Sequence, residues 1–325
     1  MKATATAPSN IAFIKYWGKK DENLKLPENG SLSMNLSDLS TTTTVEFSSD
    51  FENDEIIING KKDEIEGNRA VKHLDRIRIL AGTAQKAKVV SENNFDTGTG
   101  LSSSASGFAA LSFAAARAAG LNLTEKELSI LARQGSGSAC RSIPDGFVEW
   151  LNGNSSETSY AVSLFSPDWW DIADIVVVVN TGKKEVSTTE GMKTTITSPF
   201  FKTRLDNIKE KILTAKKLLK EKNFISFGEL VEAEALELHA IMLTSNPSLI
   251  YWTPGTLKMM KLVKKWRKED LPVYFTINTG QDIHLIVEGI NKDHVVEKLK
   301  EVEEVRNIIV NKPAKGARLI EDHLF

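Results

Sequence analysis

The sequence predicts an α+β protein built from two lobes, and three observations point to that fold class. A chain of 325 residues exceeds the size at which a single hydrophobic core usually stops growing. Its first half opens with short β-like segments between turn-forming clusters, and helical patterns follow them. The pattern then switches near residues 170 to 190. We therefore expect an N-terminal lobe at residues 1–180 and a C-terminal lobe at residues 181–325.

The N-terminal lobe begins as sheet and continues as helix. A run of β-branched threonines predicts a strand over Thr41 to Phe47. Apolar residues three or four apart predict a helix over Arg69 to Leu80, and the alanine-rich stretch from Ala105 to Ala119 predicts a second one. Thr124 followed by Glu127 has the spacing of a capping box, which predicts the start of a third helix.

The C-terminal lobe has the element order of a split βαβ, ferredoxin-like unit. A buried-looking strand at Ile172 to Val179 precedes three amphipathic helices, and a hairpin, a helix and a strand follow them. The helices are expected at about 203–222, 226–244, 255–268 and 291–304, and the later strands at Pro272–Asn278, Ile283–Glu288 and Asn307–Val310. A tight turn at residues 279–282 joins the two strands of the hairpin.

Composition excludes several classes of function. The formal net charge of -2 gives no overall field for gripping a polyanion, so we expect no nucleic-acid partner. The longest aliphatic run, Ile175 to Val179, is too short to span a bilayer. The single cysteine, Cys140, cannot form an internal disulfide, which suits the cytoplasm, and we expect it to be a buried side chain. The five histidines are scattered, so no structural transition-metal site is expected.

The segment from Gly98 to Gly107 carries the strongest single chemical signal. Its glycines and serines stand directly before a well-formed helix, where unpaired backbone N–H groups and the helix dipole favour a phosphate. Serine hydroxyls there can donate to phosphate oxygens or bind Mg²⁺. No lysine follows the glycines as in a Walker A loop, and Ser103 stands where a dinucleotide fingerprint needs its third glycine. A closely packed helix start remains the alternative.

Two further segments place cations beside polar groups. Asn10, Lys15, Tyr16 and Lys19 lie close together near the N-terminus and could orient an anion, although a strand carrying solvated lysines is the simpler interpretation. Arg141 follows a Gly/Ser loop, and its planar guanidinium could hold a carboxylate or a phosphate. A surface arginine is the alternative interpretation.

Taken together, these segments resemble the mevalonate-diphosphate decarboxylase family of the GHMP small-molecule kinase superfamily. The resemblance extends from residue 3 to about residue 290 in the family's order. The matching segments are Ala7–Ala12, Lys15–Lys19, Leu26–Pro27, Ser31–Ser33, Gly100–Gly107, Arg133–Ser142, Gly146–Trp150, His239–Met242 and Tyr251–Pro254.

The resemblance implies a GHMP kinase fold, with an N-terminal lobe like domain 2 of ribosomal protein S5 and a ferredoxin-like C-terminal lobe. It implies an ATP- and Mg²⁺-dependent reaction on a mevalonate 5-phosphate or 5-diphosphate, with the 5-diphosphate as the first candidate. The 3-hydroxyl is phosphorylated, and loss of that phosphate drives decarboxylation to an isopentenyl ester. Family members are often homodimers, so we expect one here.

The resemblance also implies roles for individual residues. Asn10 and Arg141 would hold the substrate carboxylate, and Tyr16, Lys19 and Ser198 would contact the substrate phosphate or the transferring group. Lys15 would also bind the substrate. The catalytic set would be Asn278, Lys19, Arg141 and Ser198. The ATP phosphates would bind at Gly98, Gly100, Ser102, Ser103, Ser104, Ser106 and Gly107, with the metal at Ser104.

One position departs from the family's pattern. The family has an aspartate where this chain has Asn278, and an amide cannot accept a proton at pH 7. Two explanations stay open: an engineered Asp→Asn change, or a natural enzyme that receives mevalonate 3,5-bisphosphate and needs no ATP. A third, a carboxylate supplied by Asp282, is disfavoured because a tight turn separates the two positions and Asp282 would stabilise that turn. Asp145, where a small residue is expected, is interpreted as a turn aspartate after proline.

The decarboxylase is therefore the leading hypothesis. A kinase that stops at the phosphorylated product and a catalytically dead regulator that binds the metabolite are the alternatives. Asn278 argues against the kinase and supports the regulator. The joint presence of Lys19, Arg141, Ser198 and the glycine and serine loop argues against the regulator.

Overall fold

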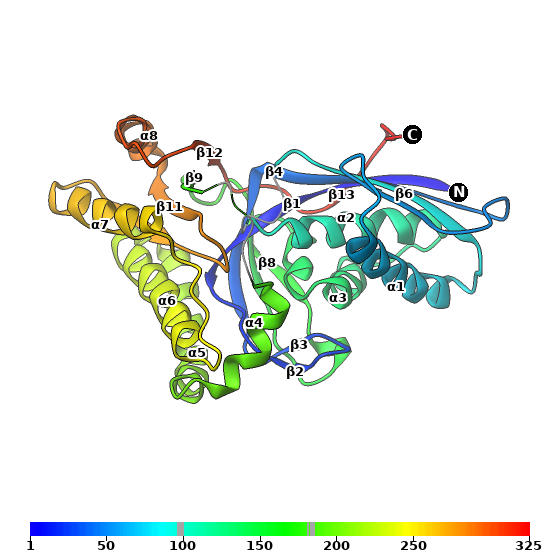
Figure 1. Cartoon of the computed structure of the whole chain (residues 1–325), viewed down its shortest axis with the longest axis horizontal. Helices are drawn as coiled ribbons and strands as arrows, with labels where there is room; N and C mark the ends of the chain where they lie inside the picture. The colour runs from blue at the N-terminus through cyan, green and yellow to red at the C-terminus, as the bar shows by residue number, and fades with distance from the viewer. Residues whose placement is uncertain (96–100, 181, 183–185) are drawn as a thin grey trace.

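The structure is a computed structural model that describes residues 1–95, 101–180, 182 and 186–325. Two lobes lie side by side along the long axis of the molecule (Figure 1). The larger sheet contains β1 (Lys2–Ile14), β4 (Ser31–Ser48), β5 (Glu55–Ile58), β6 (Lys86–Asn93), β7 (Phe147–Trp150), β8 (Ala161–Phe165) and β13 (Arg318–Ile320). The smaller sheet contains β9 (Ile172–Val178), β10 (Val273–Thr276), β11 (Ile283–Glu288) and β12 (Asn307–Asn311).

The N-terminal sheet is centred on β1 and β4, which pair antiparallel from Lys2 opposite Glu46 to Ile14 opposite Leu32. Its order is β13-β1-β4-β6-β5, while β7 pairs with the other end of β4 and β8 pairs with β7. Only the β5–β6 pair among these is parallel. A separate short pair joins β2 (Lys19–Asp21) to β3 (Leu26–Pro27).

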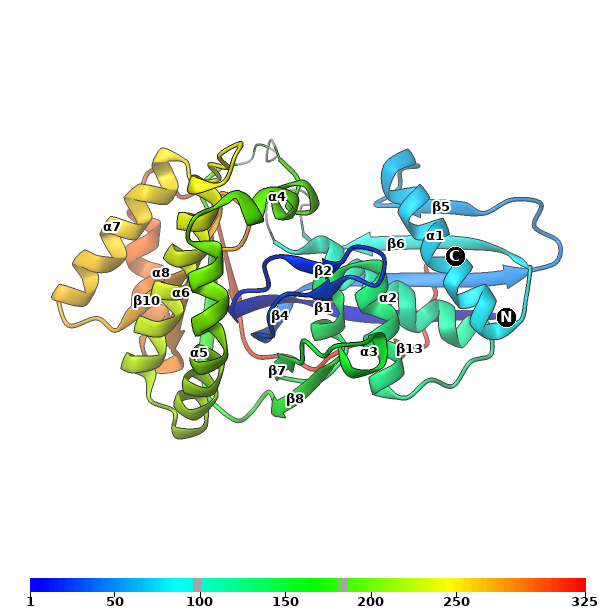
Figure 2. The same ribbon diagram turned by 90° about the horizontal axis from the view of Figure 1, so that it is seen from below.

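Three helices cover one face of this sheet: α1 (Glu64–Ala81), α2 (Ser103–Ala118) and α3 (Glu125–Gly135) (Figure 2). Alternate residues of β1, Ala3, Ala5 and Ala7, point into their core. These small side chains let the alanine-rich α2 approach the sheet closely, because alanine adds little volume between helix and strand. The expected strand and all three helices are confirmed, and so is the capping box of Thr124 and Glu127.

The C-terminal sheet has the order β10-β11-β9-β12, and every neighbouring pair in it is antiparallel. Because β11 fills the gap between β9 and β10, this is the split βαβ arrangement that the element order predicts. Its helices are α5 (Phe201–Glu221), α6 (Phe224–Thr244), α7 (Pro254–Lys268) and α8 (Lys292–Lys300). The core of α7 and α8 lies on one face, and α6 packs against the other.

Short helical segments complete the described chain. A single α-helix, α4 (Thr188–Thr194), stands between β9 and α5. The 3-10 turns are η1 (Gly137–Ser142), η2 (Ser156–Thr158), η3 (Thr195–Thr197) and η4 (Gly289–Asn291). Within the described ranges, no helix is both long and apolar enough to cross a membrane.

The sequence predicts the boundary between the lobes at residue 180, but the C-terminal sheet already includes a strand before that residue. β9 ends at Val178 but pairs with β11 and β12, so it belongs to the C-terminal sheet. The chain also returns at its end, because β13 pairs with β1 in the N-terminal sheet. Periodicity identifies a strand, but the partner strand that completes its hydrogen bonds lies far along the chain and is not visible locally.

Asp145 holds this returning segment in place. Its Oδ1 accepts a hydrogen bond from the backbone N–H of Gly316 at 2.6 Å. Ala317 N–H donates to the carbonyl of Ser142 at 2.9 Å. A Cβ at Gly316 would lie 2.0 Å from the carbonyl oxygen of Ile143, so only glycine fits this close approach. Asp145 is therefore more than a local turn residue, because it also joins the turn to a segment far along the sequence.

A shared apolar core joins the two lobes. Ile11 and Phe13 of β1 and Met34 of β4 pack with residues of α6 and of the C-terminal sheet. The rings of Phe13 and Phe227 meet edge to face with centroids 5.0 Å apart. Because β1 contributes to both cores, side chains near its end are fixed relative to both lobes.

Candidate active site

The residues around the end of β1 converge where the two lobes meet. Ser9 Oγ donates to the carbonyl of Leu101 at 2.6 Å, which ties β1 to the segment that enters α2. Asn278, in the connection between β10 and β11, donates from Nδ2 to Ser102 Oγ at 3.4 Å. The end of β1, the start of α2 and the connection between β10 and β11 therefore lie close together. The 3-10 turn η1 also lies near them, because it contacts Asn10 of β1.

Arg141 and Asn10 form a buried pair of polar side chains. Arg141 donates to Asn10 Oδ1 from Nε at 3.1 Å and from Nη2 at 2.9 Å, and Nη1 donates to Ser31 Oγ at 2.8 Å. Asn10 in turn donates from Nδ2 to Ser142 Oγ at 2.8 Å. Burial lowers the pKa of Arg141 to about 10, which leaves it a cation at neutral pH. A fixed cation and an oriented amide are suited to a carboxylate.

Lys15 lies directly beside Asn278. Its Nζ donates to Asn278 Oδ1 at 2.9 Å and to the carbonyl of Ala12 at 2.8 Å. The residue is only 2% exposed, and burial lowers the pKa of Lys15 to about 7. The interpretation of this lysine as a solvated strand residue is therefore wrong.

His239 of α6 supports the hairpin connection at Asn278. Its Nε2–H donates to the carbonyl oxygen of Asn278 at 3.1 Å, while its ring stacks on Trp252 at 4.8 Å between centroids. Burial, helped by the nearby charge of Lys15, lowers the pKa of His239 to about 3. The imidazole is therefore neutral and acts as a donor that orients position 278.

The start of α2 presents backbone amides and hydroxyls. Ser102 is the N-cap residue with a left-handed φ of 60°, and its side chain makes no capping hydrogen bond. The first turn carries no acidic residue, so the positive end of the helix dipole is not neutralised by a side chain. Ser103 is half-buried, and Ser104 is exposed with its Oγ 3.3 Å from Ser136 Oγ.

One serine of the expected phosphate loop does not follow this pattern, and two of its glycines lie outside the described residues. Ser106 is fully buried, and its Oγ bonds to Thr41 Oγ1 at 2.6 Å and to the carbonyl of Ser103 at 3.2 Å. Its hydroxyl therefore faces the sheet, and the expectation that it binds ATP is not supported by its geometry. Gly98 and Gly100 lie outside the described residues. Gly107 has open space where a Cβ would stand.

Tyr16 brings a buried hydroxyl to the same region. Its ring packs on Trp150 with centroids 4.6 Å apart, and a Cβ at Gly137 would lie 2.9 Å from its hydroxyl. Among the described residues, Tyr16 Oη has no hydrogen-bond partner. Burial raises the pKa of Tyr16, so the hydroxyl keeps its proton and stays available as a donor. Leaving such a buried donor unpaired costs about 1–3 kcal/mol.

Lys19 and Ser198 occupy the edge of the site. Lys19 has a side chain that is 5% exposed, and its Nζ pairs with Glu22 at 2.7 Å. Ser198 Oγ shares a hydrogen bond with Thr244 Oγ1 at 2.7 Å. Both segments meet at Gly18, where the backbone has φ +90° and a Cβ would lie 2.8 Å from the ring of Phe201. Within the described part of the chain, neither side chain forms a hydrogen bond with Asn278.

Comparison with known proteins decides the family. Residues 7–161 match the diphosphomevalonate decarboxylase-like N-terminal domain, and residues 174–319 match the mevalonate 5-diphosphate decarboxylase C-terminal domain. The chain belongs to the diphosphomevalonate decarboxylase family. The diphosphomevalonate decarboxylase of Candida albicans is 36% identical over 315 residues, covering 91% of this chain and 87% of the relative. The human one is 36% identical over 300 residues, covering 85% and 74%.

Solved structures of this family share the whole fold. Mevalonate diphosphate decarboxylase from Staphylococcus aureus is 40% identical, covers 98% of each chain and has a TM-score of 0.94. A structure described as MDDEF in complex with MVAPP, AMPPCP and magnesium is 39% identical, covers 99% of each chain and has a TM-score of 0.93. The GHMP kinase fold with two lobes, expected from the sequence, is therefore confirmed.

The structure of this decarboxylase-family chain adds residues that sequence reasoning missed. Glu234 and Arg204 fix the backbone at Lys15, where Glu234 Oε1 accepts from Lys15 N–H at 3.0 Å and Arg204 Nη2 donates to the Lys15 carbonyl at 2.9 Å. Ser31 and His239 contact Arg141 and Asn278. The sequence did contain a signal for Glu234 and Arg204, since each is a charged residue within the apolar pattern of its helix. A buried glutamate or arginine needs a partner, so such residues point to a buried ion pair.

Asp282 and Cys140 have structural surroundings. Asp282 is buried, and its Oδ1 accepts from the backbone N–H of Val179 at 3.3 Å, which links the hairpin connection to the end of β9. This contact favours the turn-stabilising role for Asp282 over the role of a substitute base. Cys140 is fully buried and free, and burial raises the pKa of its thiol to about 12, so it stays protonated.

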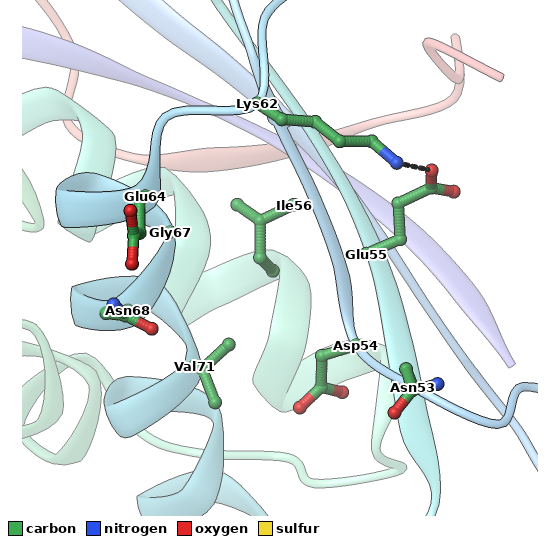
Figure 3. Close-up of a pocket in the computed structure, with 9 residues that line it drawn as sticks. All are labelled: Asn53, Asp54, Glu55, Ile56, Lys62, Glu64, Gly67, Asn68 and Val71. Carbon is green, nitrogen blue, oxygen red and sulfur yellow. Dashed lines mark ion pairs between the residues drawn. The ribbon is translucent and has the colours of Figure 1, made fainter.

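A pocket in the N-terminal lobe is not part of this site. A pocket of about 430 Å³ lies between β5 and α1, with the Lys62–Glu55 ion pair on its rim (Figure 3). Figure 2 places β5 and α1 on the side of the N-terminal lobe away from α5 and α6. The pocket brings no side chain to the polar residues at the lobe junction.

Proposed function

We propose that this chain is a carboxy-lyase that converts a phosphorylated mevalonate, with the 5-diphosphate as first candidate, into an isopentenyl ester. The observation that carries the proposal is the buried pair of Arg141 and Asn10. Asn10 lies in β1, and Lys15, which contacts Asn278, directly follows the end of that strand. A carboxylate on this pair would stand among fixed cations and donors, which catalysis by charge stabilisation needs. The relatives named mevalonate diphosphate decarboxylase support the same substrate class.

We further propose that ATP and Mg²⁺ bind at the start of α2. The exposed Ser104, the half-buried Ser103 and the N-terminal amides of α2 suit phosphate oxygens, and no acidic residue in the first turn repels them. Mg²⁺ usually keeps several waters and is bound largely through substrate phosphates, so the Ser104 hydroxyl is a sufficient protein ligand. Bound at this site, ATP would supply the phosphoryl group that turns the 3-hydroxyl into a leaving group.

The remaining residues have positioning roles in this proposal. Tyr16 Oη, a buried donor without a partner among the described residues, would bind an oxygen of the substrate. Lys19 and Ser198 would contact the substrate phosphates from the edge of the site. The homodimer and the cytoplasmic location stay predictions from the sequence.

A second candidate is the ATP-independent decarboxylation of mevalonate 3,5-bisphosphate. Asn278 favours it, since a substrate that arrives already phosphorylated has no hydroxyl proton to remove. The two candidates differ in their need for ATP. Release of CO2 separates both of them from a kinase that stops at the phosphorylated product and from a regulator that binds without turnover.

The test measures CO2 and ADP from the purified chain with mevalonate 5-phosphate, mevalonate 5-diphosphate and mevalonate 3,5-bisphosphate, each with and without Mg-ATP. We expect CO2 from the 5-diphosphate only when ATP is present. CO2 from the bisphosphate alone would establish the second candidate. ADP without CO2 would indicate a kinase, and the absence of both products together with tight binding of the esters would indicate a regulator.

A further inference from the structure

Lys15 is held in one conformation by contacts to its backbone. Its N–H donates to Glu234 Oε1 at 3.0 Å, and its carbonyl accepts from Asn29 Nδ2 at 2.8 Å and from Arg204 Nη2 at 2.9 Å. With the backbone fixed on both sides and the residue 2% exposed, the side chain cannot turn to bulk water. Its amine must satisfy its hydrogen bonds inside the site.

Both hydrogen-bond partners of the amine are neutral. Nζ donates to the carbonyl of Ala12 at 2.8 Å and to the amide oxygen of Asn278 at 2.9 Å. A charged ammonium has three donors and no acceptor, whereas an uncharged amine has two donors and one lone pair. Among the ion pairs of the described residues, none includes Lys15. The two contacts fit an uncharged amine whose lone pair is left over.

The carboxylates near Lys15 are already engaged by other groups. Glu234 pairs with Arg204 at 2.6 Å, and Asp174 of β9 bonds to His284 at 2.9 Å. The charged and titratable groups that act on or near Lys15 from the packed elements are Glu234 and His239 of α6, Arg204 of α5, Arg141 of η1 and Asp174 of β9. Burial outweighs the attraction of the two acids, and the two arginines act in the same direction as burial, which places the pKa of Lys15 at about 7.

An aspartate at position 278 would reverse this balance. A carboxylate within hydrogen-bonding distance of the amine would favour the charged ammonium and would itself be the proton acceptor. The amide of Asn278 removes that negative charge while keeping the hydrogen bond. A change from acid to amide at position 278 therefore changes the charge of Lys15 as well.

We propose that Lys15 is the proton acceptor of this enzyme, an uncharged amine that takes over the role of a carboxylate at position 278. The inference rests on the proposed ATP-dependent function. The Lys15 lone pair takes the proton of the substrate 3-hydroxyl, and the hydroxyl oxygen forms a bond to the γ-phosphorus of ATP. The bond from that phosphorus to the β,γ-bridging oxygen breaks, and ADP leaves with the electron pair. Lys15 ends the step as an ammonium beside the new phosphate.

The first experiment reads the charge of Lys15 without any turnover. In protein carrying ¹³C- and ¹⁵N-labelled lysine, the Lys15 signal is assigned by its loss in Lys15→Arg and is then followed from pH 5 to pH 11. We expect the unliganded protein to show a midpoint near 7, and Asn278→Asp to raise it by about 1–3 pH units. A midpoint near 10 in the unchanged protein, or no shift in Asn278→Asp, would overturn the inference.

The second experiment measures how the rate of CO2 release depends on pH. We expect kcat/KM for CO2 release to rise with pH through about 7 in the unchanged protein, as Lys15 loses its proton. In Asn278→Asp that rise should move to a lower pH, because a carboxylate now accepts the proton. Lys15→Met should lose about 10² to 10⁴ in rate, and exposed Lys20→Met is the matched control. A pH profile that is the same with Asn or Asp at 278 would contradict the role.

The two proposals fail in different ways. If no substrate yields CO2 with Asn or Asp at position 278, the proposed function fails, while the NMR titration still decides the charge of Lys15. If CO2 forms but Lys15 titrates as an ordinary lysine, the inference about Lys15 fails alone. Should Lys15→Met not fold, Lys15→Arg, which keeps a permanent cation, tests the same loss of rate.

Discussion

Arg204 donates from Nη2 to Glu234 Oε1 at 2.6 Å, in an ion pair whose two side chains are 0% and 1% exposed. Burial alone would raise the pKa of Glu234, but the charge of Arg204 and its hydrogen bond outweigh burial and lower that pKa. The same two residues hold the backbone of Lys15 from both sides. The pair therefore links the stability of the lobe junction to the geometry of the site.

Removing one partner of this pair should destabilise the folded protein strongly. We expect Arg204→Met to lower the free energy of unfolding by about 3–5 kcal/mol, because it leaves a buried carboxylate without its main partner. The exposed pair of Lys202 and Asp206 is the control, and Lys202→Met should change stability by less than about 0.5 kcal/mol. Urea denaturation of the variants measures both, and equal effects would refute the importance of the buried pair.

Arg141→Lys tests the clamp on the substrate carboxylate. A lysine ammonium cannot reproduce the fork that donates to Asn10 and Ser31, so we expect kcat/KM to fall about 10- to 100-fold. Arg133→Lys is the contrasting variant, because Arg133 donates to the backbone carbonyls of Leu24 and Ser156 and serves packing. It should lower the melting temperature without a selective loss of catalysis. The same loss of catalysis in both variants, or none in Arg141→Lys, would speak against the clamp.

Gly107→Ala separates stability from phosphate binding. The glycine lies in α2 with nothing near the position of a Cβ, so alanine should stabilise the protein by about 0.5–1 kcal/mol. If ATP phosphates approach this backbone closely, the Kd for ATP should rise at least about tenfold, on the order of 1.4 kcal/mol. Gly67→Ala in α1 is the matched control, since its Cβ would meet only Ile56 at 3.9 Å. Unchanged ATP affinity in Gly107→Ala would remove Gly107 from the site.

His73 should make the protein sensitive to acid. Ser112 Oγ donates to the carbonyl of Phe108 at 2.6 Å, so it accepts from His73 Nε2–H at 2.8 Å, and Nδ1 has no partner among the described residues. Burial lowers the pKa of His73 to about 3. Below pH 6.5 the histidine of the unfolded chain therefore binds a proton, whereas in the folded chain it stays neutral down to about pH 3. The free energy of unfolding falls as the pH drops between these two values.

The measurement is the slope of the unfolding free energy against pH between 6 and 4. We expect His73→Gln to reduce this slope by about 1.4 kcal/mol per pH unit, the value for one proton. His239, whose pKa burial also lowers to about 3, contributes in the same direction. Exposed His294→Gln should leave the slope unchanged. A slope that His73→Gln does not alter would show that the folded protein accepts the proton.

Local sequence patterns predicted the longer helices and the strands of the C-terminal sheet. The helix at Arg69–Leu80 lies within α1, and the capping box at Thr124 opens α3, because helix periodicity and capping depend on residues three or four apart. The ferredoxin-like order was also predictable, since hairpin and helix spacing restrict how four strands can pair. The strands β1, β5, β6, β7 and β8 were not predicted individually, and β2, β3 and β13 are too short, at two or three residues, to show periodicity.

The serine run at the start of α2 shows what local patterns cannot predict. Four serines between residues 102 and 106 look equivalent in sequence, yet Ser104 is exposed and Ser106 faces Thr41 in the sheet. Which serine is buried depends on the rotation of α2 against β4. That rotation is set by the packing of alanines further along the helix, so it cannot be predicted from the serines alone.

By itself, the sequence determined the fold class, the order of the elements and the resemblance to one enzyme family, from which we expect Asn278 at the position of that family's aspartate. Only the tertiary structure brought Lys15 to Asn278, across 263 residues of chain, and buried the lysine there. The charge of a lysine depends on its burial and on the groups around its amine, and both are properties of the folded chain. The consequence of one amide in the sequence is therefore visible only when its neighbour from the other lobe is in place.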